Sequence, residues 1–531
     1  ISSGAGDFNA AGSLGALTLS GGSFGGSGLM TLNGTGTWSG GTFAGKLQVA
    51  AGQTLTVNSA TTKSFGAGTL TNDGTVTWSD GVIDVVGSGT IANNAQFNIT
   101  ANGRWFGDAA VGSGTVTFAN NATGTVSSNV TVGVALGSSG GGTPNYFNFT
   151  NDGRIDVQQG TLYINQQVSG PAGGSFTNAA SGRVDVAAGA VLEVQNTMAA
   201  NSGIIELATG GTFRKTGGFT NAATGILRGT GLFDVGAGNA LTNLGTISPG
   251  PGTSGTAGTL AITGDLANSG TGQINLEIGG TGAGSYDVLA VSGTATLGGT
   301  LNVATLGAYT PVPADSVNGI TAAGFIGDFA VKNLPASFTG TATGTTYALA
   351  FTGAGACVGA DVCWDGGGDH VSWTDPINWS GNILPGIGDL VLVNYLGGVT
   401  VTLSSGSYSI KGLTTAAGNH LTINGGALTL AAAATTSNLT GNLNVSSGTL
   451  TATGALNASV MNLSGGTVNG SGKVTVSTDF NQTGGSFAPT GSIDLTRTLG
   501  NLSFGAFSTS GTIRLATTGA NDVVITGDLT A

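Results

Sequence analysis

Short segments of alternating apolar and polar residues follow one another along almost the whole chain. Examples are Val184–Val186, Val191–Val194 and Asn442–Val445, in which every second residue is apolar. Such segments, rich in Val, Ile, Leu, Phe and Thr and closed by Gly, Asn, Ser or Asp, are typical of β-strands joined by tight turns. No stretch repeats apolar residues with helical periodicity over the length of a helix. The pattern predicts an all-β fold.

A corner built from asparagine and glycine recurs through the first half of the chain. The asparagine follows a strand-like segment, and a glycine comes two to four residues later. The copies lie at Asn72, Asn151, Asn178, Asn201, Asn221, Asn243 and, in a weaker form, Asn268. From Asn151 onward they are 27, 23, 20, 22 and 25 residues apart, which is the length of one β-solenoid coil with two or three short strands. An ordinary β-sandwich would place its turns every ~8–12 residues without this longer recurrence.

This recurrence predicts a right-handed parallel β-helix, which is a β-solenoid, over residues 1–270. In stacked coils, each outward residue lies ~4.8 Å from the equivalent residue of the next coil. Identical charges would repel each other at that spacing, so Thr, Ser and Asn are favoured on the outside. The composition agrees, because only 7% of the residues are charged while 100 of the 531 are glycine.

Composition and charge also exclude several classes of protein. Glycine has no period of three, which excludes collagen, and the positive mean hydropathy of +0.25 argues against a disordered chain. No apolar run reaches the ~18 residues of a membrane-spanning helix. The net charge of −12, with 13 dispersed basic residues, argues against nucleic acid or an anionic membrane as a partner. We therefore expect neither nucleic-acid binding nor membrane insertion of this segment.

A longer repeat relates the two ends of the chain. Leu19–Gly28 matches Leu463–Gly472, and Gly40–Phe43 matches Gly484–Phe487, both at an offset of 444 residues. Between these ends, the glycine rhythm is lost at residues 308–338, which contain three prolines. We expect a solenoid at 1–270, a solenoid end or cap at 271–355, a connecting module at 356–400, and a second solenoid segment at 401–531 that is similar in part to 1–87.

The connecting module holds both cysteines and three of the six tryptophans. Cys357 and Cys363 predict a small disulfide loop formed in an oxidising compartment, and the alternative is a pair of reduced thiols. Trp364, Trp373 and Trp379 predict the small core of a module, and the alternative is a platform on which glycan rings stack. The other tryptophans lie near glycine corners and are expected to be wall residues of the solenoid; they are Trp38, Trp78 and Trp105.

Candidate catalytic and metal-binding residues gather in the same module. They are Asp361, Asp365, Asp369, His370 and Asp375. An acid/base site of a polysaccharide-degrading enzyme would need such a carboxylate with a partner. Asp365 and Asp369, separated by three glycines, could instead bind calcium, which prefers carboxylate oxygens, or form a solvated turn. No Cys, His and Asp spacing fits a zinc site. Because only 7% of the residues are charged, we expect no catalytic residues and no enzyme activity, and no cofactor other than calcium.

Several segments resemble large autotransporter-like bacterial surface proteins. Gly245–Gly250 with Gly258–Leu266, and Tyr286–Gly293 with Thr296–Leu301, are similar to the repeats that close a parallel β-helix passenger in that class. Trp373–Gly381 with Leu384–Gly386 is similar to the module that opens the next β-helix. The resemblance covers most of residues 240–490. It implies an exported, repetitive surface protein and specifies no receptor.

Together these observations predict an exported bacterial structural protein, located outside the cell or on its surface. It would be an elongated stalk, fibre or adhesin shaft of stacked β-coils. We expect its main partner to be a copy of itself, because an incomplete solenoid leaves an open strand edge that can pair with another chain. A glycan-binding adhesin module, with host or matrix glycans as partners, is the alternative. A polysaccharide-degrading enzyme is the third interpretation.

Overall fold

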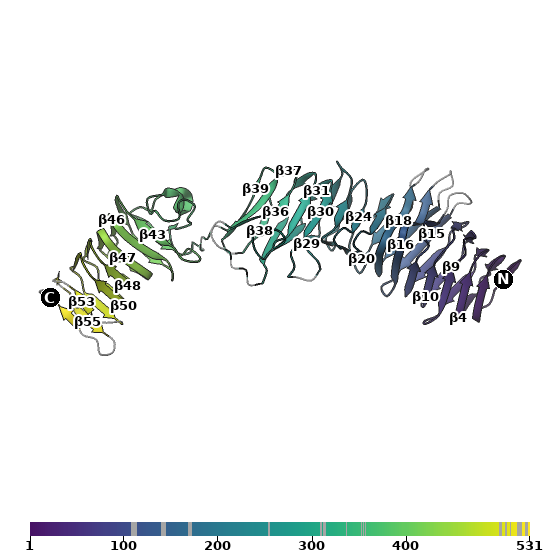
Figure 1. Cartoon of the computed structure of the whole chain (residues 1–531), viewed down its shortest axis with the longest axis horizontal. Coiled ribbons are helices and arrows are strands. Elements are labelled where there is room, and N and C mark those ends of the chain that lie inside the picture. Colours follow the sequence, from purple (N-terminus) through teal and green to yellow (C-terminus); the bar gives the residue numbers. More distant parts are fainter. Residues whose placement is uncertain are drawn as a thin grey trace. The chain divides into compact units, whose positions relative to one another are not determined.

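The computed structural model describes most of the chain as parallel β-structure (Figure 1). The residues outside the description are 108–113, 140–144, 168–172, 253–254, 308, 310, 312–314, 336, 352, 354, 356, 499–501, 505–506, 510, 518–522, 526–528 and 531. The predicted solenoid segment at 401–531 therefore lies partly outside the described residues. The described part contains two short 3-10 helices, Pro376–Asn378 and Ser380–Asn382, and no α-helix. None of its helices is long and apolar enough to cross a membrane.

The chain divides into two compact units. Unit 1 comprises residues 1–310, 316–335 and 340–349, and unit 2 comprises residues 311–315, 336–339 and 350–531. In both units, strands distant in sequence pair side by side and in parallel, and each residue lies opposite a partner residue of the neighbouring strand. This arrangement confirms the prediction of a parallel β-helix.

One coil of unit 1 contributes three short strands to three different ladders. In the coil around residue 72, these strands are β9 (Thr69–Asn72), β10 (Thr75–Trp78) and β11 (Ile83–Val85). β10 pairs in parallel with β7 (Thr54–Val57) of the preceding coil and with β13 (Gln96–Ile99) of the following coil. Every second residue is buried, as the period-two pattern requires.

The ladder that contains β10 continues through the later coils of unit 1. Its further strands are β16 (Thr125–Ser139), β18 (Arg154–Gln167), β20 (Arg183–Val186), β23 (Ile204–Leu207), β26 (Ile226–Gly229), β29 (Thr246–Pro249), β32 (Gln273–Ile278), β35 (Thr300–Thr305) and β38 (Val331–Asn333). β32, β35 and β38 belong to the stretch predicted as a solenoid end or cap. They stack on the preceding coils in the same parallel manner.

A column of phenylalanine rings fills much of the core of unit 1. Neighbouring ring centroids lie 4.6–6.4 Å apart, and every ring is buried. The rings in contact order belong to Phe24, Phe43, Phe65, Phe106, Phe147, Phe118, Phe149 and Phe176. Each such pair contributes ~0.5–1.5 kcal/mol beyond the area that it buries. Each coil is therefore stabilised mainly by its neighbours.

Unit 2 is a second stack of parallel strands with an aliphatic core. One of its ladders contains β41 (Val362–Cys363), β42 (Leu390–Val393), β45 (Gly412–Thr415), β47 (Ser437–Ala452), β48 (Leu456–Leu463), β50 (Val474–Gln482) and β52 (Ile493–Arg497). The buried side chains form one cluster from Trp364 to Leu495. The connecting module and the coils after it thus share a single core.

The 444-residue offset relates backbone elements as well as sequence. β2 (Gly12–Leu19) and β48 have the same bounds at this offset, and β3 (Ser23–Gly25) and β49 (Thr467–Gly470) start at equivalent residues. Gly26 has a φ of 100°, and its equivalent Gly470 has a φ of 119°, a backbone conformation that favours glycine. The two ends of the chain therefore contain the same local coil structure.

Candidate functional site

A column of nine buried asparagines runs through the described part of unit 1. The Nδ2 of each of the first eight donates to the Oδ1 of the asparagine in the next coil over 2.7–2.9 Å. The members are Asn72, Asn93, Asn120, Asn151, Asn178, Asn201, Asn221, Asn243 and Asn268, and all are completely buried. The eight bonds point the same way along the chain, so the amide dipoles align head to tail and polarise one another.

Each amide of this asparagine column also donates to a backbone carbonyl. Asn120 Nδ2, for example, donates to the carbonyl of Arg154 over 3.0 Å, and Asn201 Nδ2 donates to the carbonyl of Gly203 over 2.9 Å. A buried polar group left without a partner costs ~1–3 kcal/mol, so this full pairing is what allows nine amides to occupy a core. Val49 precedes the column at the equivalent buried position, and Asn268 ends it by donating to the carbonyl of Gly298 over 2.6 Å.

Glycine follows most of these asparagines because the chain passes very close to the previous coil. A Cβ on Gly225 would lie 2.2 Å from Asn221 Oδ1 and 2.4 Å from the carbonyl oxygen of Asn201, so no larger residue fits. The asparagine-glycine pattern identifies seven of the nine members. Asn120 has the same spacing, since Gly124 follows four residues later, but it is not among the seven copies named from the sequence. Asn93 does not fit the pattern, because no glycine follows it in the turn.

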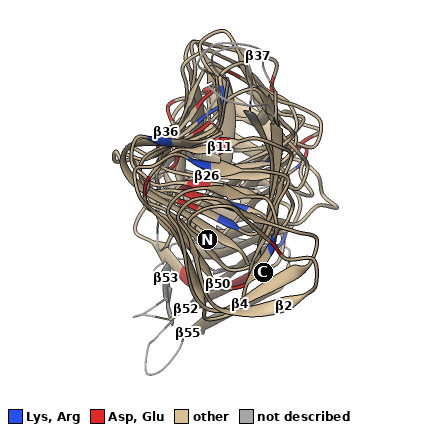
Figure 2. Cartoon of the chain, turned by 90° about the vertical axis from the view of Figure 1, so that its right-hand side faces the viewer, with Lys and Arg blue, Asp and Glu red and all other residues tan. Residues whose placement is uncertain are grey.

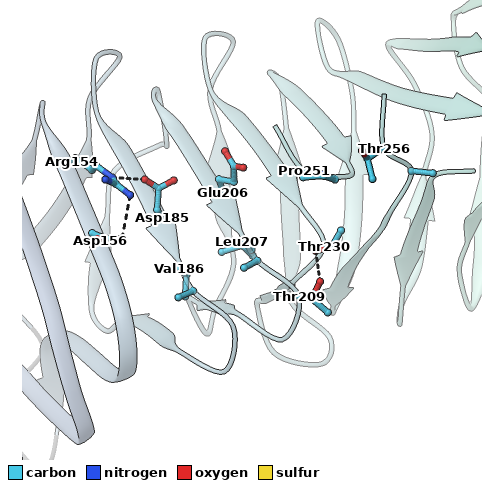
Figure 3. Close-up of a pocket in the computed structure, with 13 residues that line it drawn as sticks. Arg154, Asp156, Asp185, Val186, Glu206, Leu207, Thr209, Thr230, Pro251 and Thr256 are labelled. Carbon is cyan, nitrogen blue, oxygen red and sulfur yellow. Dashed lines mark hydrogen bonds and ion pairs between the residues drawn. The ribbon is translucent and has the colours of Figure 1, made fainter. Parts of the chain in front are cut away.

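A network of ion pairs lies on the outer face of four of these coils, although charged residues are sparse over the chain as a whole (Figure 2). Arg183 lies between Asp185 at 2.7 Å and Glu206 at 2.8 Å. Glu206 also pairs with Arg228 at 2.7 Å, and Arg154 pairs with Asp185 at 2.6 Å (Figure 3). Five charged groups on four successive coils are therefore joined in one chain of alternating sign.

This network corrects the expectation that identical charges avoid stacking. Arg154 lies directly opposite Arg183, and Asp156 lies opposite Asp185, in adjacent parallel strands. The repulsion is offset because each arginine reaches diagonally to a carboxylate, as Arg154 does to Asp185. The segments Gly153–Val157 and Gly182–Val186 share the pattern Gly-Arg-x-Asp-Val. That pattern is a sequence signal for such a ladder once the two segments are placed in register.

The charged residues border a groove of about 620 Å³ on unit 1 (Figure 3). Small residues such as Ala187 and Ala208 line it, and Pro251 and Thr256 also contribute. Partial burial acts to raise the pKa of Glu206, but hydrogen bonds from Arg228 and the Gly252 N–H outweigh it and lower that pKa. A general acid needs a raised carboxyl pKa, so Glu206 is suited to a structural ion pair rather than to proton transfer.

The three tryptophans of the connecting module form its core. Trp379 contacts Trp364 and Trp373 edge to face, with ring centroids 4.9 and 4.8 Å apart. Trp379 Nε1 also donates to the carbonyl of Trp373 over 2.8 Å. All three rings are completely buried. This burial corrects the alternative of a glycan platform at these residues, because no ring face is open to a sugar.

The aspartates of the module hold its turns together. Asp369 Oδ1 accepts hydrogen bonds from the N–H groups of Val371 and Ser372 and from Asn378 Nδ2, over 2.7–2.9 Å. Hydrogen bonds from Ser372, through its side chain and its backbone, hold the pKa of Asp369 well below its usual range. Asp365 Oδ1 accepts instead from the N–H of Gly367 over 3.1 Å. Both carboxylates that are candidates for calcium binding thus accept hydrogen bonds within turns, and calcium binding stays a prediction.

The remaining candidates for acid/base or metal chemistry also make local hydrogen bonds, and Asp375 Oδ2 accepts from the N–H of Asp369 over 3.2 Å. Asp361 accepts from the N–H of Leu390, and Asp375 accepts from the N–H of Ile377 at the start of a 3-10 helix. The His370 ring lies beside Tyr395. Throughout the described residues, no group of three or more His, Cys, Asp or Glu side chains is placed to hold a metal ion.

The two cysteines form the predicted disulfide. Cys357 and Cys363 are bonded, and their Cα atoms lie 5.7 Å apart. Cys363 belongs to β41, which pairs with β42, and its N–H donates to Ser380 Oγ over 3.0 Å. The disulfide loop therefore leads directly into the first strand of unit 2 and the tryptophan core beside it.

The chain was compared with protein families and with curated protein sequences. No protein-family model matches it, and no curated protein sequence matches it. The resemblance to autotransporter-like surface proteins thus depends on the sequence segments alone and stays a prediction.

The buried carboxyl group of Asp287 links two separate segments of the chain in unit 1. Asp287 is 1% exposed. Its Oδ1 accepts from the N–H of Gly258 over 2.8 Å, and its Oδ2 accepts from the N–H of Glu277 over 2.9 Å. Burial raises the pKa of Asp287 to about 7, and the nearby Glu277 carboxylate adds to this effect, while the two backbone hydrogen bonds oppose it.

Asp287 should make the stability of unit 1 depend on pH. Because its folded pKa of about 7 lies above the ordinary aspartate pKa of 3.8, the folded state binds more protons than the unfolded state in this window. Its contribution is fully present below pH ~4 and is lost as the pH rises to ~7. Denaturant unfolding, with amide exchange at Gly258 and Glu277, should show the wild type losing stability relative to Asp287→Asn across this window. A difference that stays constant from pH 4 to pH 8 would contradict the assignment.

Proposed function

We propose that this chain is an exported bacterial structural protein, a segment of a stalk, fibre or adhesin shaft. The observation that carries the proposal is the asparagine column, which joins nine successive coils through buried amide hydrogen bonds. A column of this kind fixes the register of every coil relative to the next. It suits a protein whose task is to keep its length and stiffness.

The proposed mechanism is mechanical and uses interactions between neighbouring coils. Each coil adds backbone hydrogen bonds, a core layer and one amide of the column, so stability grows with the number of interfaces. The ion pairs between Arg154, Asp185, Arg183, Glu206 and Arg228 add cross-links on the outer face. The equivalent coils at an offset of 444 residues support a design in which similar segments follow one another. The disulfide favours a location outside the cytoplasm.

Electron microscopy and scattering of the purified chain test the proposed shaft. We expect elongated particles, and fibres that increase with protein concentration if copies join end to end. Strictly monomeric elongated particles would instead favour a segment of one longer shaft. Compact globular particles would contradict the proposal. Immunogold labelling of cells that produce the protein should place the label outside the cell, and labelling confined to the cytoplasm would contradict export.

A further inference from the structure

Trp105 differs from the other five tryptophans because its ring is exposed. It lies on β14 (Arg104–Phe106) and is 36% exposed, whereas the other five are at most 2% exposed. The flanking Phe106 points inward and is buried, so Trp105 faces outward by the alternation of the strand. The expectation that Trp105 is simply a wall residue like Trp38 and Trp78 therefore does not account for its position.

A second aromatic side chain lies two coils along the same outward column. Trp105 is opposite Ala135 of β16, and Ala135 is opposite Tyr163 of β18. The backbone positions of the two aromatic residues are therefore roughly 9–10 Å apart. The coil between them carries the small residues Gly133 and Ala135 here, next to the exposed Val132. A Cβ on Gly133 would lie 3.2 Å from Tyr163 Cε2, so the tyrosine ring leans over this glycine.

These residues line a groove of about 240 Å³ on the outside of unit 1. Trp105 and Tyr163 supply aromatic surface, and the partly exposed Gly133 lies between them, while Ala135 is buried beside it. Arg104 and Gln166 provide polar groups within the lining. Arg104 is held by Asp80, with Nε 2.8 Å from Oδ1, so its charge is largely compensated. The groove is smaller than the ~300–1,000 Å³ of sites for drug-sized ligands, which suits one or two units of a longer polymer.

We propose that this groove is a binding site for a neutral glycan. The apolar C–H face of a pyranose ring complements an exposed aromatic face, and its hydroxyl groups complement the amide of Gln166 and the guanidinium of Arg104 at the edge. An aromatic pair separated by a coil of small residues offers both kinds of contact. The compensated charge of Arg104 favours neutral over acidic sugars. This site is additional to the shaft function, and neither depends on the other.

Titration of the full chain with soluble neutral oligosaccharides tests the proposal. The probes are oligomers of glucose, mannose, xylose, galactose and N-acetylglucosamine, followed by calorimetry and by tryptophan fluorescence. At least one should bind saturably and shift the emission of Trp105. Trp105→Ala and Tyr163→Ala should each weaken that binding about tenfold or more, whereas Trp105→Phe should retain part of it because an aromatic face remains.

A matched control separates binding from stability. Ile387 is 71% exposed in unit 2, and Ile387→Ala should leave glycan affinity unchanged. Thermal unfolding of Trp105→Ala should stay close to the wild type because the ring is largely outside the core. The proposal is overturned if none of the probes binds, or if binding survives both aromatic substitutions. Failure of the shaft proposal would show separately, as compact particles in microscopy.

Discussion

Asn178→Asp should destabilise unit 1 by roughly 3–5 kcal/mol at neutral pH. In the wild type, Asn178 Oδ1 accepts from Asn151 over 2.8 Å and Asn178 Nδ2 donates to Asn201 Oδ1 over 2.7 Å. An ionised aspartate can still accept the first bond but cannot donate the second. It would instead bring a buried negative charge against the amide oxygen of Asn201 and the carbonyl of Ile204, which is also an acceptor of Asn178.

Acidification should rescue much of the stability of this variant. A protonated aspartic acid has one O–H donor and one carbonyl acceptor, so it can replace the amide in the column. Since the folded state favours the protonated form, the pKa of the new carboxyl is raised and stability is lost as the pH rises through it. Urea unfolding of the wild type and the variant across the acid-to-neutral range, with amide exchange of β20 and β23, measures the effect.

Asn462→Asp provides the matched control for this experiment. Asn462 Nδ2 also donates to an asparagine one coil away, Asn444, over 2.8 Å, but it lies on the partly exposed outside of unit 2. Water can solvate a charge there, so we expect a loss below about 1 kcal/mol. If Asn178→Asp were as stable as the wild type at pH 8, the buried amide column would not be a stabilising element.

The sequence predicts the class of fold because the spacing between the repeated asparagine corners gives the length of one coil. Alternation of apolar residues identifies the strands, and recurring asparagines such as Asn151 and Asn178 identify the coils. What spacing cannot give is the direction in which the asparagine side chain points. An asparagine at a turn is usually read as a surface residue, whereas here each one is buried and bonded to its equivalents. That bonding requires the register between coils, which only the structure supplies.

Register also explains why the candidate sites in the sequence differ from those in the structure. Asp365 and Asp369 are close in sequence, yet each holds its own turn. Arg183 and Glu206 are 23 residues apart but form an ion pair, because one coil separates them. In a solenoid, residues one coil apart are nearest neighbours. A sequence window shorter than a coil therefore misses the contacts that make a site.

Burial of the tryptophans likewise cannot be read from their clustering. Trp364, Trp373 and Trp379 are close in sequence and completely buried, whereas the isolated Trp105 is exposed. The cluster is accompanied by a disulfide and a short 3-10 helix, which supply the surrounding structure of a core. Trp105 lies opposite the small Ala135 of the neighbouring coil and is 36% exposed.

Trp379→Ala should destabilise unit 2 by about 3–5 kcal/mol, as removal of a fully buried aromatic ring commonly does. The ring contacts both Trp364 and Trp373, so the substitution leaves a cavity at the centre of the cluster. It also leaves the carbonyl of Trp373 without the N–H donor of Trp379. Denaturant unfolding followed by amide exchange in β41 and β42 measures the loss. The near-ultraviolet circular dichroism of the coupled indoles should fall with it.

Trp105→Ala is the matched control for this prediction, because it makes the same substitution at another tryptophan. It removes the same ring from a 36% exposed position in unit 1, so its effect on stability should be close to that of an ordinary surface substitution, about 0.5 kcal/mol. Trp379→Phe should recover most of the loss, because a phenyl ring preserves edge-to-face contacts while omitting the Nε1 hydrogen bond, which contributes ~1 kcal/mol. If Trp379→Ala and Trp105→Ala were equally stable, the tryptophan cluster would not be the core of the connecting module. A large loss in Trp379→Ala alone would establish that burial, and not the presence of an indole, decides the role of each tryptophan.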